Sequence, residues 1–124
     1  MRFKNFIITL LLFVAFSSCK TTDVNAVASR SDIKEIVNDP QTTLIDVRIA
    51  DQFSDKTASG AINIPLALIE DNLDFLKKQK QIVIFCNTGR QADQAIEILR
   101  KNGIKNAYSA KSLQNVQAIR NETR

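Results

Sequence analysis

The sequence of 124 residues contains no histidine and no tryptophan, and it has only two cysteines, three glycines and two prolines. Without histidine the chain cannot build a Ser-His-Asp triad, a Cys-His pair or a metal site with an imidazole ligand. Cys19 and Cys86 are too far apart in the sequence for a Cys-x-x-Cys redox pair, and they are too few for a four-cysteine zinc site. Any enzyme chemistry must therefore rest on one cysteine, carboxylates, arginines and backbone amides.

An excess of charge of either sign is also missing from the main part of the chain. The net charge is +4, but Arg2 and Lys4 lie in a leader without acids, and removing these two from the 17 bases leaves 15 against 13 acids. This balance, with no basic patch interleaved with aromatic residues, argues against nucleic acid as a partner. The composition, 44% hydrophobic and 24% charged, is ordinary for one small globular domain.

The first 18 residues have the layout of a secretory signal. A short basic region precedes eleven positions, Phe6 to Phe16, that are apolar except for Thr9. This run is too short to span a bilayer comfortably, but it suits the hydrophobic region of a signal peptide. Two small residues then precede Cys19. The layout resembles a bacterial lipoprotein signal, in which the cysteine is acylated and becomes the new N-terminus.

Two other interpretations of the leader stay open. Ala26-Val27-Ala28 fits the rule for ordinary signal cleavage, although it lies far beyond Phe16, and an uncleaved signal anchor would leave Cys19 inert. We expect lipidation at Cys19, with residues 19–28 as a tether and residues 29–124 as the folded domain. The domain would be exported as a periplasmic-side or outer-membrane lipoprotein that touches the membrane only through its lipid. The alternative is a soluble periplasmic protein.

Export would place Cys86 in an oxidising compartment. If Cys19 is acylated or removed, Cys86 is the only thiol left in the chain and has no disulfide partner there. A lone exported thiol is open to oxidation unless it is buried or used in chemistry.

Helical and strand patterns alternate along the domain. They predict helices over 29–38, 66–78, 91–101 and 112–120, a short helical turn that begins at residues 51–53, and strands over 43–47, 61–64, 82–85 and 107–109. Ser29 and Asp32 resemble the capping box of the first helix, and Asn38-Asp39-Pro40 ends it. The alternation predicts an α/β domain with an open, mainly parallel sheet and helices on both faces.

Cys86 directly follows the strand from Ile82 to Phe85, which is apolar at every position, as expected for a parallel strand covered on both faces. In open α/β sheets, ligands bind beyond the C-terminal ends of the strands. The position therefore favours Cys86 as a nucleophile. The alternative is a small buried hydrophobe at a strand end, the common fate of free cysteines.

A short polar loop, Asn87-Thr88-Gly89-Arg90-Gln91, links Cys86 to the next helix, which is expected to start at Gln91 or Ala92. Its backbone N–H groups and the helix N-terminus predict a nest for an anion. Gly89 permits a left-handed turn or a close approach to a ligand. Arg90 adds a permanent cation that can bind the anion. The alternative is that Arg90 is a surface arginine surrounded by solvent. The same field favours a thiolate over a thiol.

The spacing in this loop discriminates between two kinds of chemistry. Tyrosine-phosphatase-like cysteine loops place an arginine after five intervening residues, a position that is Ala92 here. Only three residues separate Cys86 from Arg90. The tighter loop favours a persulfide sulfur on the cysteine over a bound phosphate.

Four motifs together resemble the rhodanese-like sulfurtransferases, and the resemblance covers about residues 29–113. They are Leu44-Ile45-Asp46-Val47-Arg48, then Phe53, then Gly60 to Leu66, then Ile82 to Gln91. Their order and spacing also match. The Cys-Asn-x-Gly-Arg-Gln loop is most similar to that of the single-domain periplasmic rhodaneses of the phage-shock type.

The resemblance implies a persulfide mechanism without a metal or organic cofactor. Cys86 thiolate would attack the outer sulfur of thiosulfate or a similar small anion, and a thiol or another thiophilic acceptor would then take the sulfur. Arg90 would hold the sulfonate, and Asn87, Thr88, Gly89 and Gln91 would complete the substrate-binding loop. Such covalent catalysis in two half-reactions predicts ping-pong kinetics.

Some positions near the motifs are expected to be structural or depart from the family. Asp46 lies in an apolar strand and must find partners at its end, and Arg48 is expected to pair with an acid. Thr57 stands where a histidine is common in the family, and Lys111-Ser112-Leu113 stands where Gly-Gly-Leu often packs near the active loop. These departures concern substrate preference more than the fold. A second hypothesis is a non-catalytic rhodanese-fold module that holds a persulfide or docks a partner.

Overall fold

The computed structural model describes residues 29–122, so the predicted signal, the tether and Cys19 lie outside the described residues. In chain order the elements are α1 (Arg30–Asn38), β1 (Thr42–Asp46), α2 (Ala50–Asp55), β2 (Ile62–Asn63), the 3₁₀ helices η1 (Leu66–Leu68) and η2 (Glu70–Asn72), α3 (Leu73–Lys77), β3 (Gln81–Cys86), α4 (Arg90–Lys101), β4 (Ala107–Ser112) and α5 (Leu113–Arg120). Strands thus alternate with helices, as the sequence predicts.

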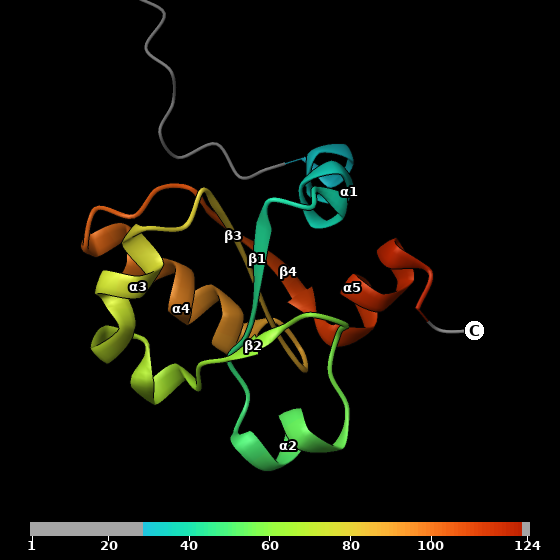
Figure 1. Cartoon of the computed structure of the whole chain (residues 1–124), viewed down its shortest axis with the longest axis horizontal. Helices are drawn as coiled ribbons and strands as arrows, with labels where there is room; N and C mark the ends of the chain where they lie inside the picture. Colours follow the sequence, from blue (N-terminus) through green and yellow to red (C-terminus); the bar gives the residue numbers. More distant parts are fainter. Residues whose placement is uncertain (1–28, 123–124) are drawn as a thin grey trace, which may run out of the picture.

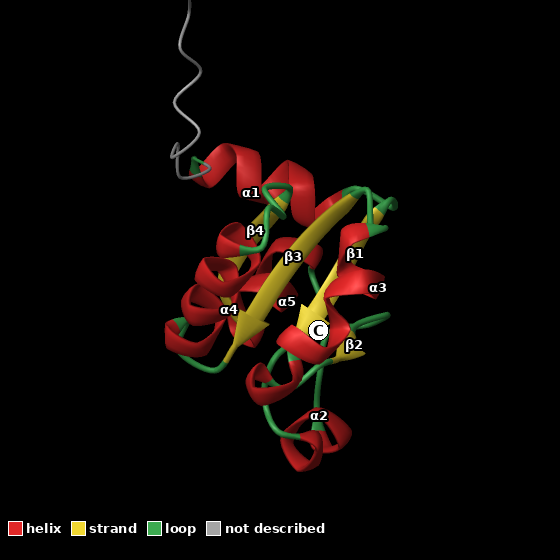
Figure 2. Cartoon of the chain, turned by 90° about the vertical axis from the view of Figure 1, so that its left-hand side faces the viewer, coloured by secondary structure: helices red, strands yellow, loops and turns green. Residues whose placement is uncertain are grey.

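The described strands form one four-stranded sheet in the order β2-β1-β3-β4, and every neighbouring pair is parallel. Helices cover both faces of the sheet, and α2 lies beyond the C-terminal ends of β1 and β3 (Figures 1 and 2). The predicted α/β class is confirmed. Because β3 is a central strand, the loop after Cys86 opens at the middle of the sheet's C-terminal edge.

Alternating side chains of β3 divide the core into two halves. Ile82 and Ile84 pack on the side of α3 and α4, whereas Val83 and Phe85 pack on the side of α1 and α5. All four side chains are fully buried. Cys86 continues the first set, so its side chain belongs to the face covered by α4.

The N-terminal cap of α1 is confirmed. The Ser29 hydroxyl accepts a hydrogen bond from the Asp32 amide at 3.2 Å, and the Asp32 carboxylate accepts one from the Ser29 amide at 3.0 Å. The bonds from the side chain and then the backbone of Ser29 lower the pKa of Asp32. The helix ends before Pro40, which cannot continue it.

The predicted continuous helix over residues 66–78 is wrong. The segment forms two 3₁₀ turns, η1 and η2, before the short helix α3. Asn72 has a non-helical ψ of 15°, and its side-chain amide donates to the Leu68 carbonyl at 2.8 Å, which offers the backbone an alternative to the α-helical pattern. The apolar periodicity still identifies the buried side chains, because Ile69 and Leu76 are both fully buried.

Two boundaries near the predicted site also differ. Helix α4 begins at Arg90 rather than at Gln91 or Ala92, with Gly89 as its N-cap residue. Strand β4 runs on to Ser112, beyond the predicted end at Ser109, because a β-bulge lets it stay paired with β3 as far as Cys86.

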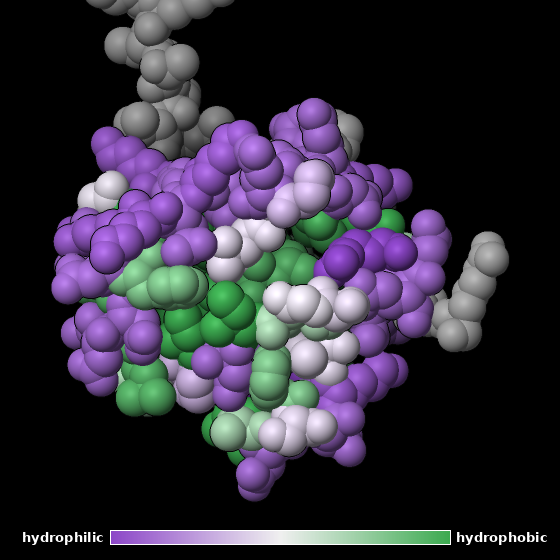
Figure 3. All heavy atoms as spheres, in the orientation of Figure 1, coloured by the Kyte–Doolittle hydropathy of each residue, from purple (hydrophilic) through white to green (hydrophobic). Residues whose placement is uncertain are grey.

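Within residues 29–122, no helix combines the length and apolar character needed to cross a bilayer. Apolar side chains nevertheless reach the surface, and Figure 3 shows them gathered near the centre of one face between hydrophilic margins. The large hydrophobic residues with the most exposed side chains are Ile49, Ile62, Leu68 and Phe75.

Candidate active site

The Cys86 thiol lies at the C-terminal end of β3 and has two backbone partners. The Gly89 amide donates a hydrogen bond to the sulfur at 3.0 Å, and the thiol faces the Lys111 carbonyl oxygen at 3.5 Å. Cys86 is only 2% exposed, and it forms no disulfide within the described chain. The sulfur is therefore fixed by the main chain on two sides and almost covered.

The loop after Cys86 turns sharply into α4. Gly89 adopts φ 100°, a conformation that suits glycine, and its carbonyl accepts the helical hydrogen bond from the Asp93 amide at 2.9 Å. The amides of the first helical turn have no acceptor within the helix. They and the positive end of the macrodipole face the loop, where they stabilise negative charge on a sulfur or a bound anion.

Arg90 occupies the first position of α4 and has an exposed side chain. Within residues 29–122 it forms no hydrogen bond or ion pair with its side chain, so its guanidinium is available to an anion that enters the loop. Thr88 and Gln91 are also exposed beside it. The predicted cation, Arg90, thus lies at the loop, and no side chain within residues 29–122 neutralises it.

Asp46 and Arg48 form a buried ion pair next to the loop. Arg48 Nη2 lies 2.7 Å from Asp46 Oδ2, and Arg48 Nε and the Arg48 amide each donate to Oδ1 at 3.0 Å. Asp46 is 0% exposed and Arg48 is 6% exposed. Two charges this deeply buried are tolerated only with such complete hydrogen bonding.

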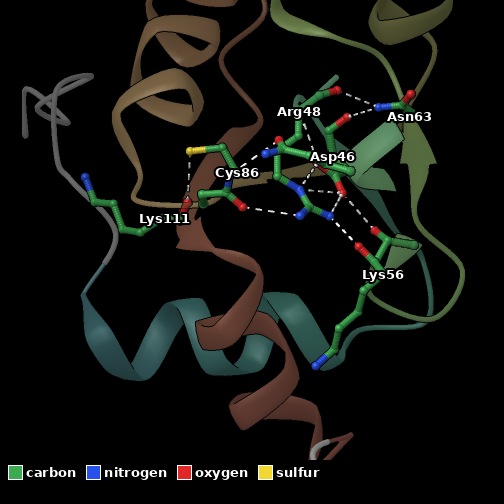
Figure 4. Close-up of polar contacts among 9 residues, drawn as sticks. Asp46, Arg48, Lys56, Asn63, Cys86 and Lys111 are labelled. Carbon is green, nitrogen blue, oxygen red and sulfur yellow. Dashed lines mark hydrogen bonds and ion pairs between the residues drawn. The ribbon is translucent and has the colours of Figure 1, made fainter. Parts of the chain in front are cut away.

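Arg48 also connects β1 to the loop that carries the thiol. Its Nη1 donates to Asn87 Oδ1 at 3.2 Å, and its Nη2 donates to the Lys56 carbonyl (Figure 4). The Asn87 side chain further reaches Gln52 of α2 at 3.4 Å. Asn87, predicted to bind substrate, therefore directs its side chain toward Arg48. In Figure 4 the Cys86 sulfur points the other way, toward Lys111.

Sequence reasoning missed two residues that complete this cluster. Thr57, noted only as a departure from a common histidine, donates its hydroxyl to Asp46 Oδ2 at 2.9 Å. Asn63 donates its amide to the Asp46 carbonyl at 3.0 Å and to the Arg48 carbonyl at 2.9 Å. The only signal for Asn63 was a polar residue inside a short strand that parallels β1.

A β-bulge brings Lys111 to the thiol from the other side. The pairing of β4 with β3 shifts between Ile84 and Phe85, and Lys111 adopts φ 68°. A side chain at such a φ costs on the order of 1–2 kcal/mol relative to glycine. Lys111 occupies the first of the two positions where the resemblance implied glycine, a residue that adopts this φ without strain.

The Lys111 ammonium ends in an ion pair with Asp93 of α4, at 2.8 Å from each carboxylate oxygen. Partial burial raises the pKa of Asp93. Hydrogen bonds from Lys111 and Ser109, together with the Lys111 charge, outweigh that effect, so the pKa lies below its ordinary value of 3.8. Asp93 is therefore ionised, and paired, at neutral pH.

A cavity of about 380 Å³ lies beside the loop, lined by Lys56, Asn87, Leu113, Gln114 and Gln117. Neither Cys86 nor Arg90 lines it, so it is separate from the covered sulfur. Among the residues that the structure describes, no three histidine, cysteine, aspartate or glutamate side chains gather closely enough to hold a metal ion.

The arrangement of strand, thiol and loop occurs in a known protein family. The model of the family "Rhodanese-like domain" matches residues 29–113, more than half of the chain. The chain belongs to the rhodanese-like domain family. The matched segment contains both sides of the site, from the Asp46–Arg48 pair to Lys111.

Curated relatives of this rhodanese-like chain include sulfur-transfer proteins. Over 74 residues it is 35% identical to the thiosulfate sulfurtransferase PspE of Escherichia coli (strain K12). The alignment covers 58% of this chain and 71% of PspE. It is 24% identical to the putative sulfur carrier protein YrkF of Bacillus subtilis (strain 168), over 72% of this chain but only 48% of YrkF. These relatives support a sulfur-transfer function.

Solved structures share the fold. A rhodanese with anions from E. coli matches with a TM-score of 0.56 and 34% identity, covering 60% of this chain and 89% of that one. The human single-domain sulfurtransferase TSTD1 matches with a TM-score of 0.60 over 79% of this chain and 96% of its own, at 21% identity. The second likeness shows the fold alone.

Proposed function

We propose that the protein is a thiosulfate sulfurtransferase that carries sulfur as a persulfide on Cys86. The observation that carries the proposal is the hydrogen bond of 3.0 Å from the Gly89 amide to the Cys86 sulfur at the end of the central strand. A donor aimed at the sulfur stabilises its thiolate and a persulfide anion that replaces it. The family membership and the activity named for PspE support the same chemistry.

In the first half-reaction, the Cys86 thiolate attacks the outer sulfur of thiosulfate. The new S–S bond forms while the bond between the two thiosulfate sulfurs breaks, and sulfite leaves with that electron pair. The product is a Cys86 persulfide anion, so the total charge is unchanged. Arg90 pairs with the sulfonate oxygens, for which its planar fork is suited.

In the second half-reaction, a thiolate acceptor attacks the outer sulfur of the persulfide. The acceptor becomes a persulfide, and Cys86 is released as a thiolate. With cyanide as the acceptor, the product is thiocyanate. With Cys19 acylated, Cys86 is the only thiol in the chain, so the acceptor comes from another molecule.

One observation favours a second candidate, a module that holds a persulfide without turnover. Cys86 is only 2% exposed, which suits a protected sulfur as well as a reactive one. In both hypotheses thiosulfate loads the cysteine, but only the enzyme releases the sulfur repeatedly to an acceptor.

Intact mass and turnover separate these hypotheses. The full-length protein should gain the mass of one sulfur atom after incubation with thiosulfate, and it should form thiocyanate over many cycles when cyanide is added. Cys86→Ser should lose both signals, and its folding is checked by circular dichroism. Loading without turnover would favour the module, whereas an unchanged mass and no thiocyanate would reject the enzyme.

We also propose that the chain is exported and held to a membrane by a lipid on Cys19, which lies outside the described residues. The basic and apolar leader before Cys19 supports this proposal. In cells fed a labelled fatty acid, the wild-type chain should acquire label and sediment with membranes. Cys19→Ser should do neither. Label that persists in Cys19→Ser would refute lipidation at this position.

A further inference from the structure

Lys111 contacts the catalytic loop with both its main chain and its side chain. The bulge in β4 places the Lys111 carbonyl 3.5 Å from the Cys86 sulfur. The bulge is itself held in place, since the Lys111 amide donates to the Ser109 hydroxyl at 3.2 Å and Asn115 donates to the Ala110 carbonyl at 3.2 Å. β-bulges next to active sites commonly redirect one side chain.

The aliphatic part of the Lys111 side chain lies against Gly89. A methyl group on Gly89 would stand 3.0 Å from Lys111 Cδ and 3.1 Å from Lys111 Cβ, so the two residues are already in close contact. Gly89 is the residue whose amide holds the Cys86 sulfur, and Cys86 is 2% exposed. The Lys111 stem therefore packs on the residue whose amide holds the thiol.

The charged end of Lys111 is held less firmly than its stem. Its ammonium pairs with Asp93, but the two side chains are 54% and 50% exposed. Ion pairs this exposed are weak and are screened by salt. Such a pair can be broken by a competing anion.

We propose that Lys111 is a specificity-determining residue, whose side chain is a strap over Gly89 that closes the Cys86 sulfur to neutral molecules and opens to anionic sulfur donors. With the ammonium on Asp93, the stem lies on Gly89 and the sulfur is covered. When an oxyanion takes the ammonium from Asp93, the stem leaves Gly89 and the sulfonate of the donor is held by Lys111 as well as by Arg90. This inference rests on the proposed function, because it concerns how the sulfur donor reaches the same Cys86 thiol.

Alkylation of Cys86 measures access to the sulfur independently of sulfur transfer. Neutral iodoacetamide and anionic iodoacetate would be reacted with the full-length protein, and modification would be quantified on the peptide that contains Cys86. Rates would be compared for all variants in the same buffer at pH 7. Lys111→Gly removes the strap, Lys111→Met keeps the stem without the charge, and Asp93→Asn releases the ammonium.

A matched control is Lys101→Met, which removes an exposed lysine from another ion pair on α4, with side chains 72% and 68% exposed. Lys111→Gly should react fastest with iodoacetamide. Asp93→Asn should react about two- to fivefold faster than wild type, the range that loss of an exposed ion pair allows. Added salt should accelerate wild type but not Asp93→Asn, and Lys101→Met should behave as wild type.

The ratio of the iodoacetate rate to the iodoacetamide rate reports the role of the charge. It should fall in Lys111→Gly and Lys111→Met and stay at or above the wild-type value in Asp93→Asn. Iodoacetamide rates within twofold of wild type in Lys111→Gly and Asp93→Asn, or an unchanged ratio in Lys111→Met, would overturn the proposal. If the rates shift as expected while thiosulfate adds no sulfur mass to any variant, the strap stands and the proposed function fails.

Discussion

The main-chain amide of Gly89 donates a hydrogen bond of 3.0 Å to the sulfur of Cys86, three residues earlier in the chain. This contact depends on Gly89 at φ 100°. Lys111 of β4 lies against the same glycine. Sulfur, glycine and lysine thus form one packed unit, and changes at any of the three should be coupled.

Gly89→Ala should destabilise the protein and reduce sulfur loading. An alanine at φ 100° is strained, by on the order of 1–3 kcal/mol, and its methyl would press on the Lys111 stem. Gly103→Ala is the control, because Gly103 also has a positive φ but has open space around it. Urea unfolding should show a larger loss for Gly89→Ala. If Lys111→Gly does not reduce that loss in the double variant, the two residues are not coupled as we infer.

Asp46→Asn should strongly destabilise the protein. Breaking a buried ion pair leaves Arg48 without its counter-charge and typically costs about 3–5 kcal/mol. Glu97→Gln is the matched control, since the Glu97–Lys101 pair is exposed, and its loss should cost less than about 1 kcal/mol. Urea unfolding measures both variants. Equal losses would show that the Asp46–Arg48 pair does not support the fold.

Arg90→Ala should weaken the use of thiosulfate more than it affects stability. A hydrogen bond to a charged group contributes about 1.5–3 kcal/mol, so kcat/KM for thiosulfate should fall roughly 10- to 100-fold. Arg100→Ala changes an exposed arginine in the last turn of the same helix and should leave kcat/KM near wild type. Similar values for both variants would place Arg90 outside the substrate site.

The Asp93–Lys111 pair should stabilise the fold at neutral pH and lose its effect in acid. The pKa of Asp93 is lower in the folded protein than its ordinary value of 3.8, so the contribution is present above 3.8 and disappears as pH falls through the folded pKa. Because both side chains are half exposed, we expect it to be below about 1 kcal/mol.

Urea unfolding of wild type and Asp93→Asn should therefore differ at pH 7 and converge in strong acid. By NMR titration, Lys111→Met should raise the pKa of Asp93 toward 3.8. If the difference in unfolding free energy between wild type and Asp93→Asn grew as pH falls, the Asp93–Lys111 pair would not be its cause.

Ile69→Ala should be costly although Ile69 lies outside any α-helix. Ile69 connects η1 and η2, and its side chain is fully buried in the core. Truncating a buried isoleucine to alanine typically costs about 2–5 kcal/mol. Leu68→Ala, at a neighbouring position with 47% exposure, should cost under about 1 kcal/mol. The opposite order in urea unfolding would mean that the two 3₁₀ turns pack with a different face inward.

Patterns that act over a few residues were predicted well. The capping box joins Ser29 and Asp32, three residues apart, and the helix predicted over 91–101 is observed, with Ala92, Ala95, Ile96 and Leu99 buried on one face. The apolar strand before Cys86 is the central β3, paired on both sides. The same periodicity failed over residues 66–78, because a repeat of buried side chains does not distinguish an α-helix from successive 3₁₀ turns.

The contacts around the site join residues far apart in the sequence. The sequence predicted that Arg48 pairs with an acid, and the resemblance implied that residues 111–113 lie near the loop, but the detailed partners were not predicted. Thr57 had been noted only as a departure from a common histidine, and Asn63 stood out only as a polar residue in a short strand, so neither was expected to complete the hydrogen bonding of Asp46 and Arg48. The approach of Lys111 to Gly89 depends on one extra residue in β4, which alters the register with β3. Register and bulges are set by pairing across the sheet, which a single stretch of sequence does not encode.

The sequence by itself determined the order of elements, the thiol at the end of a buried strand, and a glycine and an arginine in the short loop after it. These follow from hydrophobic periodicity and from the backbone freedom of glycine, both of which are local. The tertiary structure decided how the thiol is held and covered. That outcome depends on packing and hydrogen bonds that bring the Arg48 cluster to one side of the loop and Lys111 to the other.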